Sequence, residues 1–147
     1  MALPHLDWVL PNSKVTPGSI NSDVTQSNIQ STICVSGWTK TIRPKTSYTN
    51  SLKKQQLSKD YKYLIIDYGS NLTNYEEDHL ISLELGGNPL DPKNLWTQPW
   101  IGNNARQKDV IETKLKKLVC SGTIKLSVAQ KAIASNWVKA YNKYKKY

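Results

Sequence analysis

Residues 76–95 read EEDHLISLELGGNPLDPKNL. An acid, Asp78, directly precedes His79, which is one of only two histidines in the chain. A neutral imidazole accepts a proton from water near pH 7, and a carboxylate oxygen is the hard ligand that Mg²⁺ prefers. Both kinds of group are needed to hydrolyse a phosphodiester with one metal ion.

A turn and a second polar signal follow this pair. Gly86-Gly87 favours a tight turn, and Asn94-Leu95 stands fifteen residues past His79. The whole stretch resembles the core motif of the HNH, or ββα-metal, nuclease superfamily, which runs Asp-His-apolar, Gly-Gly, Asn-Leu, and then a helix bearing an Asn or His ligand. The likeness covers roughly residues 75–119.

A longer segment, from Tyr75 to Tyr141, looks like a group of small bacterial HNH-type proteins. The shared elements are Asn-Leu-Trp, Lys-Asp-x-x-Glu, Val-Cys and Ala-Gln-x-x-Ile-Ala. The resemblance implies a small α+β domain built around a ββα-metal core with flanking helices. It also implies an HNH-type endonuclease that uses one divalent metal ion, and it names no specific substrate.

Charge is distributed unevenly along the 147 residues. The net charge is +9, with eight Lys/Arg against four Asp/Glu in residues 1–70 and eleven against two in residues 101–147. Residues 71–100 are acidic, with five acids and one lysine. An acidic island between basic flanks suits a nuclease, because carboxylates hold the ion and cations hold the phosphate backbone. A lysine-rich solvated surface is the alternative.

Cys34 and Cys120 stand 86 positions apart, a spacing that excludes the Cys-x-x-Cys pairs of a zinc finger. They are candidates for one disulfide, with two separate buried thiols as the alternative. No apolar run approaches the roughly 18 residues of a membrane span, and the start at Met1 lacks the features of a signal peptide. We therefore expect no membrane association, and we favour a secreted protein with its signal peptide removed over a cytosolic one.

The flanking segments predict short elements around the motif. An irregular arm is expected over residues 1–20 and a single domain over residues 21–147. The expected elements are a helix from a Thr25 cap to about Ile33, an edge strand over 38–42, a helix capped by Ser47 or Thr49 and running through Leu57, a strand or helical turn over 61–68, and a last helix over about 127–142 that opens with the capping box Ser127-x-x-Gln130.

The core elements are placed by the resemblance. The first strand is expected to end near Asp78-His79, the second to lie around Asn94-Leu95-Trp96, and the helix to begin near Asn104. Its apolar stripe is predicted to consist of Ile111, Leu115, Leu118 and Val119.

The resemblance also assigns roles within the motif. His79 is the predicted general base, active in its neutral form, and Asp78 is the predicted ligand of the metal ion. Asn94 is expected to hydrogen-bond across the loop between the strands and to fix the orientation of the histidine. Glu76 and Glu77 are expected to be solvated, with positions near the ion as the alternative.

The third metal ligand is expected at the start of the helix, on Asn104 or Asn103. Asn104 is preferred, and a helix-capping role together with Gln107 is compatible with it. A carboxylate, an amide oxygen, water and phosphate make an all-oxygen site, which favours Mg²⁺ or Mn²⁺ over Zn²⁺.

Cations of the same helix are candidates for holding the substrate. Lys108 lies one turn past Asn104 and is predicted to hold the scissile phosphate or to stabilise the charge that builds on it. Arg106 is the second candidate because a guanidinium pairs with phosphate through two bonds. Lys114 and Lys117 are expected to contact nucleic acid, and solvated helix charges are the alternative throughout.

These features predict an endonuclease that hydrolyses DNA with little sequence preference, since no sequence-reading module is recognisable. RNA is the alternative substrate. The rival predictions are a catalytically inactive nucleic-acid-binding protein on the same scaffold and an extracellular binding or structural domain. A scavenging enzyme, an antibacterial toxin and a phage enzyme all fit, and a toxin would have an immunity or inhibitor protein as its partner.

Overall fold

The computed structural model describes residues 8–147, apart from the side chain of Asn103, so His5 lies outside the described residues. The strands and α-helices are β1 (Tyr75–His79), β2 (Leu95–Pro99), α1 (Thr46–Ser58), α2 (Ile65–Tyr68), α3 (Asn104–Cys120), α4 (Leu126–Ser135) and α5 (Trp137–Tyr144). The 3₁₀ helices are η1 (Gln26–Ser31), η2 (Trp38–Thr41), η3 (Lys62–Leu64), η4 (Leu72–Asn74), η5 (Leu83–Leu85), η6 (Pro92–Asn94) and η7 (Ile101–Asn103).

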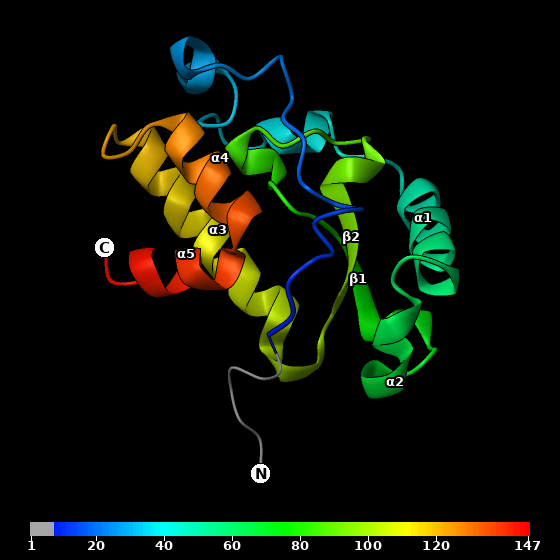
Figure 1. The fold of residues 1–147 in the computed structure, drawn as a ribbon. Helices are drawn as coiled ribbons and strands as arrows, with labels where there is room; N and C mark the ends of the chain where they lie inside the picture. Colours follow the sequence, from blue (N-terminus) through cyan, green and yellow to red (C-terminus); the bar gives the residue numbers. More distant parts are fainter. Residues whose placement is uncertain (1–7) are drawn as a thin grey trace.

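A two-stranded antiparallel sheet lies at the centre of the fold, which confirms the α+β class. Tyr75 pairs with Pro99 at one end of the register and His79 with Leu95 at the other. In Figure 1 the hairpin stands between α1 on one side and the group of α3, α4 and α5 on the other. The two strands and the helix that follows them occur where the sequence predicts them, with α3 beginning at Asn104.

The loop between the strands closes tightly on itself around Gly87. A Cβ atom at Gly87 would lie 1.6 Å from the carbonyl oxygen of Ile81 and 2.9 Å from Nδ2 of Asn94, so only glycine fits there. Gly86 has a φ of +77°, which glycine adopts without strain. The two glycines therefore serve the turn, and they bring the end of β1 close to the start of β2.

Helix α3 covers the hairpin with one apolar stripe. Ile111, Leu115 and Val119 are buried, and Leu118 is partly buried at the edge of the stripe. Cys120, the last residue of α3, forms a disulfide with Cys34, with Cα atoms 5.8 Å apart. The bond fastens the segment after η1 to the end of α3 and closes a loop of 86 residues.

The arm before η1 is pinned along its described length, from residue 8 to 20. The indole Nε1 of Trp8 donates to the carbonyl oxygen of Gly102, and its ring stacks on Trp137 with centroids 5.3 Å apart. Gly18 N–H donates to the carbonyl oxygen of Lys93, and Ile20 forms an isolated bridge with Gly87. In Figure 1 the arm runs between β2 and the C-terminal helices.

The strand predicted over residues 38–42 is wrong, and residues 61–68 adopt the helical form that was the alternative to a strand. Residues 38–41 form η2, because Gly37 turns the chain with a φ of +82° and the N–H of Lys40 donates to the Gly37 carbonyl. Residues 61–68 form η3 and α2, which end at Gly69 with a φ of +85°. Both segments contain β-branched or aromatic residues, but in the described part of the chain no further strand is available to pair with them.

Three helix ends also differ from the predictions. Lys45 is the N-cap of α1 in place of Ser47 or Thr49, and Lys125 is the N-cap of α4 in place of Ser127. The predicted last helix is broken at Asn136, which is extended, with a φ of −169°, and whose side chain accepts from the N–H of Lys139 to cap α5. Within residues 8–147, no helix has both the length and the apolar character needed to cross a membrane.

Candidate metal and active site

The alternation of β1 sorts its acids onto two faces. Asp78 pairs with Trp96 in the register, and its Oδ2 accepts from the indole Nε1 of Trp96 at 2.8 Å. Glu77 lies opposite Thr97, whose hydroxyl is within 3.1 Å of Glu77 Oε1 and within 2.7 Å of Oε1 of Gln56 in α1. Glu77 therefore faces α1, whereas Asp78 faces α3.

A pocket of about 420 Å³ runs beside β1, from the start of α1 to α3. No β2 residue lines it, so it follows the unpaired edge of β1. Both Asp78 and His79 line the pocket, although neighbours on a regular strand point to opposite faces. Its acidic lining consists of Glu76, Glu77, Asp78, Glu84, Asp109 and Glu112.

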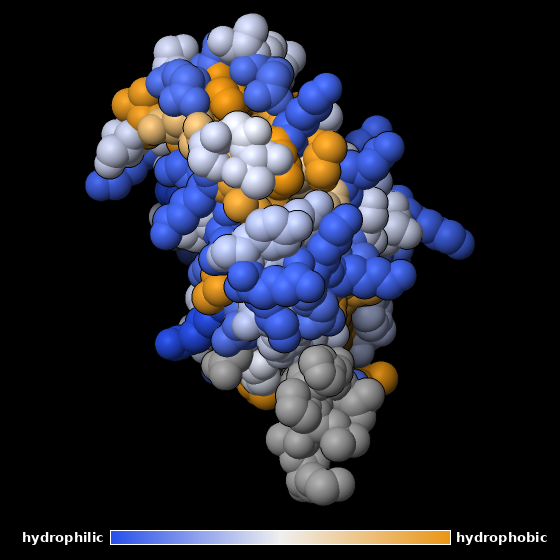
Figure 2. Space-filling model, turned by 90° about the vertical axis from the view of Figure 1, so that its left-hand side faces the viewer, coloured by the Kyte–Doolittle hydropathy of each residue, from blue (hydrophilic) through white to orange (hydrophobic). Residues whose placement is uncertain are grey.

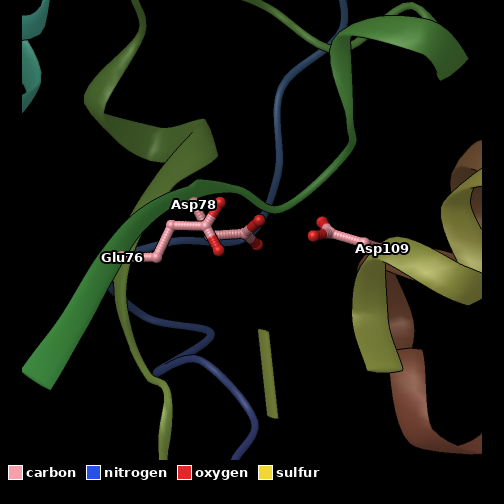
Figure 3. Close-up of side chains that lie close together, drawn as sticks. All are labelled: Glu76, Asp78 and Asp109. Carbon is pink, nitrogen blue, oxygen red and sulfur yellow. The ribbon is translucent and has the colours of Figure 1, made fainter. Parts of the chain in front are cut away.

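Three of these carboxylates gather at one point. Glu76 and Asp78 from β1 and Asp109 from α3 each offer an oxygen, and the three oxygens lie within 4.8 Å of one another. Figure 3 shows the carboxylate of Asp109 reaching from α3 towards the two acids of β1. An oxygen of Glu76, Oε2, is buried without a hydrogen-bond partner among the described residues. Three hard oxygen donors at this spacing could hold a cation such as Mg²⁺ or Mn²⁺.

The crowding of acids changes their protonation. Burial, reinforced by the charges of Asp78 and Asp109, raises the pKa of Glu76 to about 8. Burial and the charge of Asp78 likewise raise the pKa of Asp109 to about 6. With these raised pKa values the two carboxyl groups ionise less readily than free ones. A bound cation would lower both pKa values and favour the ionised forms.

His79 is held in one tautomer by the loop between the strands. Its Nε2 lies 2.9 Å from the carbonyl oxygen of Pro89. A carbonyl only accepts, so Nε2 carries the hydrogen and Nδ1 of the neutral ring keeps its lone pair. Burial lowers the pKa of His79, partly offset by the bond to Pro89. Among the described residues, no hydrogen bond engages Nδ1, so His79 is equipped to accept a proton at neutral pH.

Asn94 makes the hydrogen bonds across the loop that the sequence predicts. It is fully buried, its Oδ1 accepts from the N–H of Ile81 at 3.0 Å, and its Nδ2 donates to the carbonyl oxygens of Ile81 and Asn88. Its backbone carbonyl accepts from the N–H of Leu80. The residue thus holds the chain directly after His79, while the part it plays in catalysis remains a prediction.

Lys108 lies where a substrate cannot reach it. The side chain is fully buried, and Nζ lies 2.8 Å from Oδ2 of Asp78, 2.6 Å from Oε2 of Glu112 and 2.9 Å from the carbonyl oxygen of His79. These contacts use all three ammonium protons. Burial alone would lower the pKa of Lys108, but the carboxylates of Asp78 and Glu112 raise it above its ordinary value. The predicted contact between Lys108 and a phosphate is therefore blocked.

The start of α3 also differs from the predicted ligand position. Asn104 is buried, with Oδ1 accepting from the N–H of Val9 at 2.6 Å and Nδ2 donating to the carbonyl oxygen of Ile101. Its amide thus anchors the N-terminal arm, and Asn104 is not among the residues that line the pocket. The side chain of Asn103 lies outside the described residues. The α3 carboxylate that joins Glu76 and Asp78 is that of Asp109.

The predicted cations of α3 lie in different settings. Arg106 and Lys117 are exposed, whereas Lys114 is half-buried and its ammonium contacts the carbonyl oxygen of Tyr147. Figure 2 shows that the face over the C-terminal helices is largely hydrophilic. Arg43, which the sequence did not single out, lines the pocket and forms no ion pair within the described residues.

Glu76 and Glu77 were expected to be solvated, but both are partly buried and line the pocket. Three further residues of the pocket escaped the sequence-based prediction: Asp109, Glu112 and Arg43. The Lys-Asp-x-x-Glu motif is visible in the sequence as two acids on a basic helix. Helical periodicity would have placed Asp109 next to the buried apolar stripe of that helix. For Arg43, no sequence signal existed, since its position depends on how η2 and α1 pack.

The chain has no significant match among protein-family models, curated proteins or solved structures.

Proposed function

We propose that this protein is a metal-dependent endonuclease of the HNH type, which hydrolyses phosphodiester bonds in DNA with little sequence preference. One observation supports it above the others. The last two residues of β1 bring to the same pocket a carboxylate within a three-acid cluster and an imidazole whose Nδ1 is free to accept a proton.

The ion is proposed to be Mg²⁺ or Mn²⁺, held by Asp78, Glu76 and Asp109. The fit rests on the close approach of their three oxygens and on the unpartnered, buried Oε2 of Glu76. Asp109 takes the place that the sequence suggested for Asn104, whose amide is occupied by the arm. When bound, such an ion supplies Lewis-acid stabilisation of the charge on the phosphate and on the departing oxygen.

His79 performs the proton transfer in this proposal. Nδ1 takes a proton from water as the water oxygen bonds to phosphorus and the bond from phosphorus to the 3′ oxygen breaks, and the departing 3′ oxygen takes a proton from solvent. The bond from Nε2–H to the Pro89 carbonyl keeps the ring in place and favours the imidazolium that forms. The resemblance implies 5′-phosphate and 3′-hydroxyl products.

DNA is the proposed substrate because the acidic pocket lies within a strongly basic chain. The net charge of +9 attracts a polyanion, and Arg43, Arg106 and Lys117 are exposed cations on the pocket wall or on α3. Contacts of this kind read the phosphate backbone, so cleavage is expected to depend little on sequence.

A plasmid-nicking assay tests the proposal. Wild-type protein with Mg²⁺ should convert supercoiled DNA to open circles, and EDTA should stop it. Asp78→Asn and His79→Ala should lose cutting while still binding DNA in a fluorescence-anisotropy titration. Unchanged cutting by His79→Ala would overturn the mechanism. DNA binding by the wild type without cutting under any divalent ion would favour the inactive binding protein, and preferential cutting of RNA would reassign the substrate.

A further inference from the structure

The ammonium of Lys108 sits at the centre of the contacts behind the candidate site. It contacts three groups on two elements: Oδ2 of Asp78 and the backbone carbonyl of His79 at the end of β1, and Oε2 of Glu112 one helical turn away on α3. No part of this side chain is exposed to solvent. A buried lysine with every proton engaged has no capacity left for a substrate.

We propose that Lys108 is a positioning residue, which holds Asp78 so that a single carboxylate oxygen, Oδ1, faces the metal cluster. This inference rests on the proposed function. Trp96 assists, because its indole Nε1 donates to the same Oδ2 that Lys108 contacts. In the described part of the chain, no hydrogen bond or ion pair engages Oδ1. Asp78 thus presents one occupied oxygen and one open oxygen.

The same ammonium fixes the imidazole indirectly. Its bond to the carbonyl of His79 ties the backbone of the proposed base to α3 at 2.9 Å. The relative placement of base and ligand is therefore set by one side chain that touches both residues. Small displacements of such groups have large effects on rate, because proton transfer and attack require aligned atoms.

The positive charge of Lys108 opposes the binding of a metal ion. A role in positioning and a role through charge therefore predict different effects of removing Lys108 on metal affinity and on rate. A positive charge beside Asp78 repels an incoming cation, so a lysine that mattered only through its charge would weaken metal binding and leave the rate at saturating metal alone. A positioning lysine instead sustains the rate. Removing it should leave Mn²⁺ binding as tight as before or tighter, while the cleavage rate at saturating Mn²⁺ falls.

The experiment compares Lys108→Met with Lys131→Met, an exposed lysine on α4. Mn²⁺ affinity is measured by calorimetry, the environment of the bound ion by electron paramagnetic resonance, and plasmid nicking as a single-turnover rate at saturating Mn²⁺. For Lys108→Met we expect a rate about 10- to 100-fold lower, a Kd for Mn²⁺ that does not rise, and an altered resonance spectrum. Lys131→Met should match the wild type in all three.

A second matched pair covers the case in which Lys108→Met does not fold. Trp96→Phe and Trp137→Phe each remove one hydrogen bond from a buried indole, the first to Asp78 and the second to the partly buried carbonyl of Val9. Only Trp96→Phe should lower the single-turnover rate with an unchanged or lower Kd for Mn²⁺.

The proposal is overturned if either site variant keeps the wild-type rate, or if its slower cutting is fully restored by more Mn²⁺. The proposed function is judged separately, on the wild type. If the wild type fails to cut, or if Asp78→Asn binds Mn²⁺ as the wild type does, the nuclease assignment fails irrespective of Lys108.

Discussion

The side-chain amide of Asn94 forms a two-bond pair with the backbone of Ile81, accepting from its N–H and donating to its carbonyl oxygen, each at 3.0 Å. In an antiparallel sheet, two paired residues exchange the same two hydrogen bonds through their backbones. Here the side chain of Asn94 replaces one of the two backbones. It continues the pairing of the hairpin beyond His79, where the strands themselves have separated.

Asn94→Ala should therefore lower the free energy of unfolding and abolish the proposed DNA cleavage. Loss of the amide leaves the N–H and carbonyl of Ile81 and the carbonyl of Asn88 buried without partners, at a cost of roughly 2–4 kcal/mol in the free energy of unfolding. Urea denaturation measures this. Asn28→Ala, which removes the solvent-exposed hydrogen bonds of a half-buried capping amide, should cost only about 1 kcal/mol. Equal losses in the two variants would contradict the role of Asn94.

The pH dependence of cutting should report His79. Burial lowers its pKa, so the neutral, proton-accepting form predominates at a lower pH than for a free histidine. At saturating Mn²⁺, we expect the acid limb of the rate profile to have its midpoint below the ordinary value of about 6.5. His79→Ala should cut about 10²- to 10⁴-fold more slowly and lose that limb. A limb that persists in His79→Ala would assign it to another group.

The acid cluster should make the metal-free protein less stable in alkali. The folded state raises the pKa of Glu76 to about 8, so it binds a proton that the unfolded chain has released, and stability falls as pH rises from about 4.5 to about 8. Glu76→Gln should thus raise the free energy of unfolding by about 1–3 kcal/mol at pH 8.5 and change it little at pH 5.

The control for this effect is Asp67→Asn, which removes an exposed acid of α2. It should alter stability at neither pH. Added Mn²⁺ should reverse the ranking at pH 8.5, because it stabilises the wild type by binding and Glu76→Gln much less. Thermal melts at both pH values, with and without Mn²⁺, give the comparison. A pH-independent effect of Glu76→Gln would contradict the electrostatic origin.

The disulfide should contribute to stability without contributing to chemistry. Replacing Cys34 and Cys120 with serine removes a crosslink that closes 86 residues, and we expect a loss of roughly 2–5 kcal/mol in the free energy of unfolding. Both sulfur atoms lie outside the pocket lining, so the nicking rate of the folded variant at low temperature should equal that of the wild type. A rate loss in the folded variant would show that the crosslink also shapes the site.

Gly87 should tolerate no side chain. In Gly87→Ala the new Cβ would overlap the carbonyl oxygen of Ile81, so the loop must move and take Asn94 with it. In Gly122→Ala the new Cβ meets no atom within 4 Å. The only cost is the strain of an alanine at a φ of +80°, about 1 kcal/mol in the free energy of unfolding. Circular dichroism melts should rank Gly87→Ala well below Gly122→Ala.

The resemblance placed the hairpin and the start of α3 correctly, and the motif that carries it is local. Asp78, His79, the Gly-Gly turn and Asn94 lie within twenty residues, and each acts through neighbours in the chain. Segment 38–42 was wrongly predicted as a strand, and segment 61–68 adopted its helical alternative, because strand-forming composition has no effect where no described strand is present to pair with. Their outcome was decided by packing, which is not local.

The site was less predictable than the fold around it. Asn104 and Asp109 both lie near the start of α3, and helical periodicity alone does not say which turn faces the pocket. In the structure the N–H of Val9, in the N-terminal arm, donates to the side-chain amide oxygen of Asn104, so this amide faces the arm and not the pocket. Lys108 showed the opposite problem. A lysine on a basic helix reads as a surface charge, and its burial depends on two acids from different parts of the chain.

The pinning of the N-terminal arm has a consequence for how the chain acquires its structure. Trp137 donates to the carbonyl of Val9 across 128 residues, and Trp8 stacks on the same indole. Contacts of such long range are slow to form, because the chain between them must be ordered first. During synthesis, Trp8 and Val9 have no partner until Trp137 has been made, so this part of the fold forms only after the whole segment from residue 8 to 137 exists. The arm also anchors Asn104, and the start of α3 is therefore completed late.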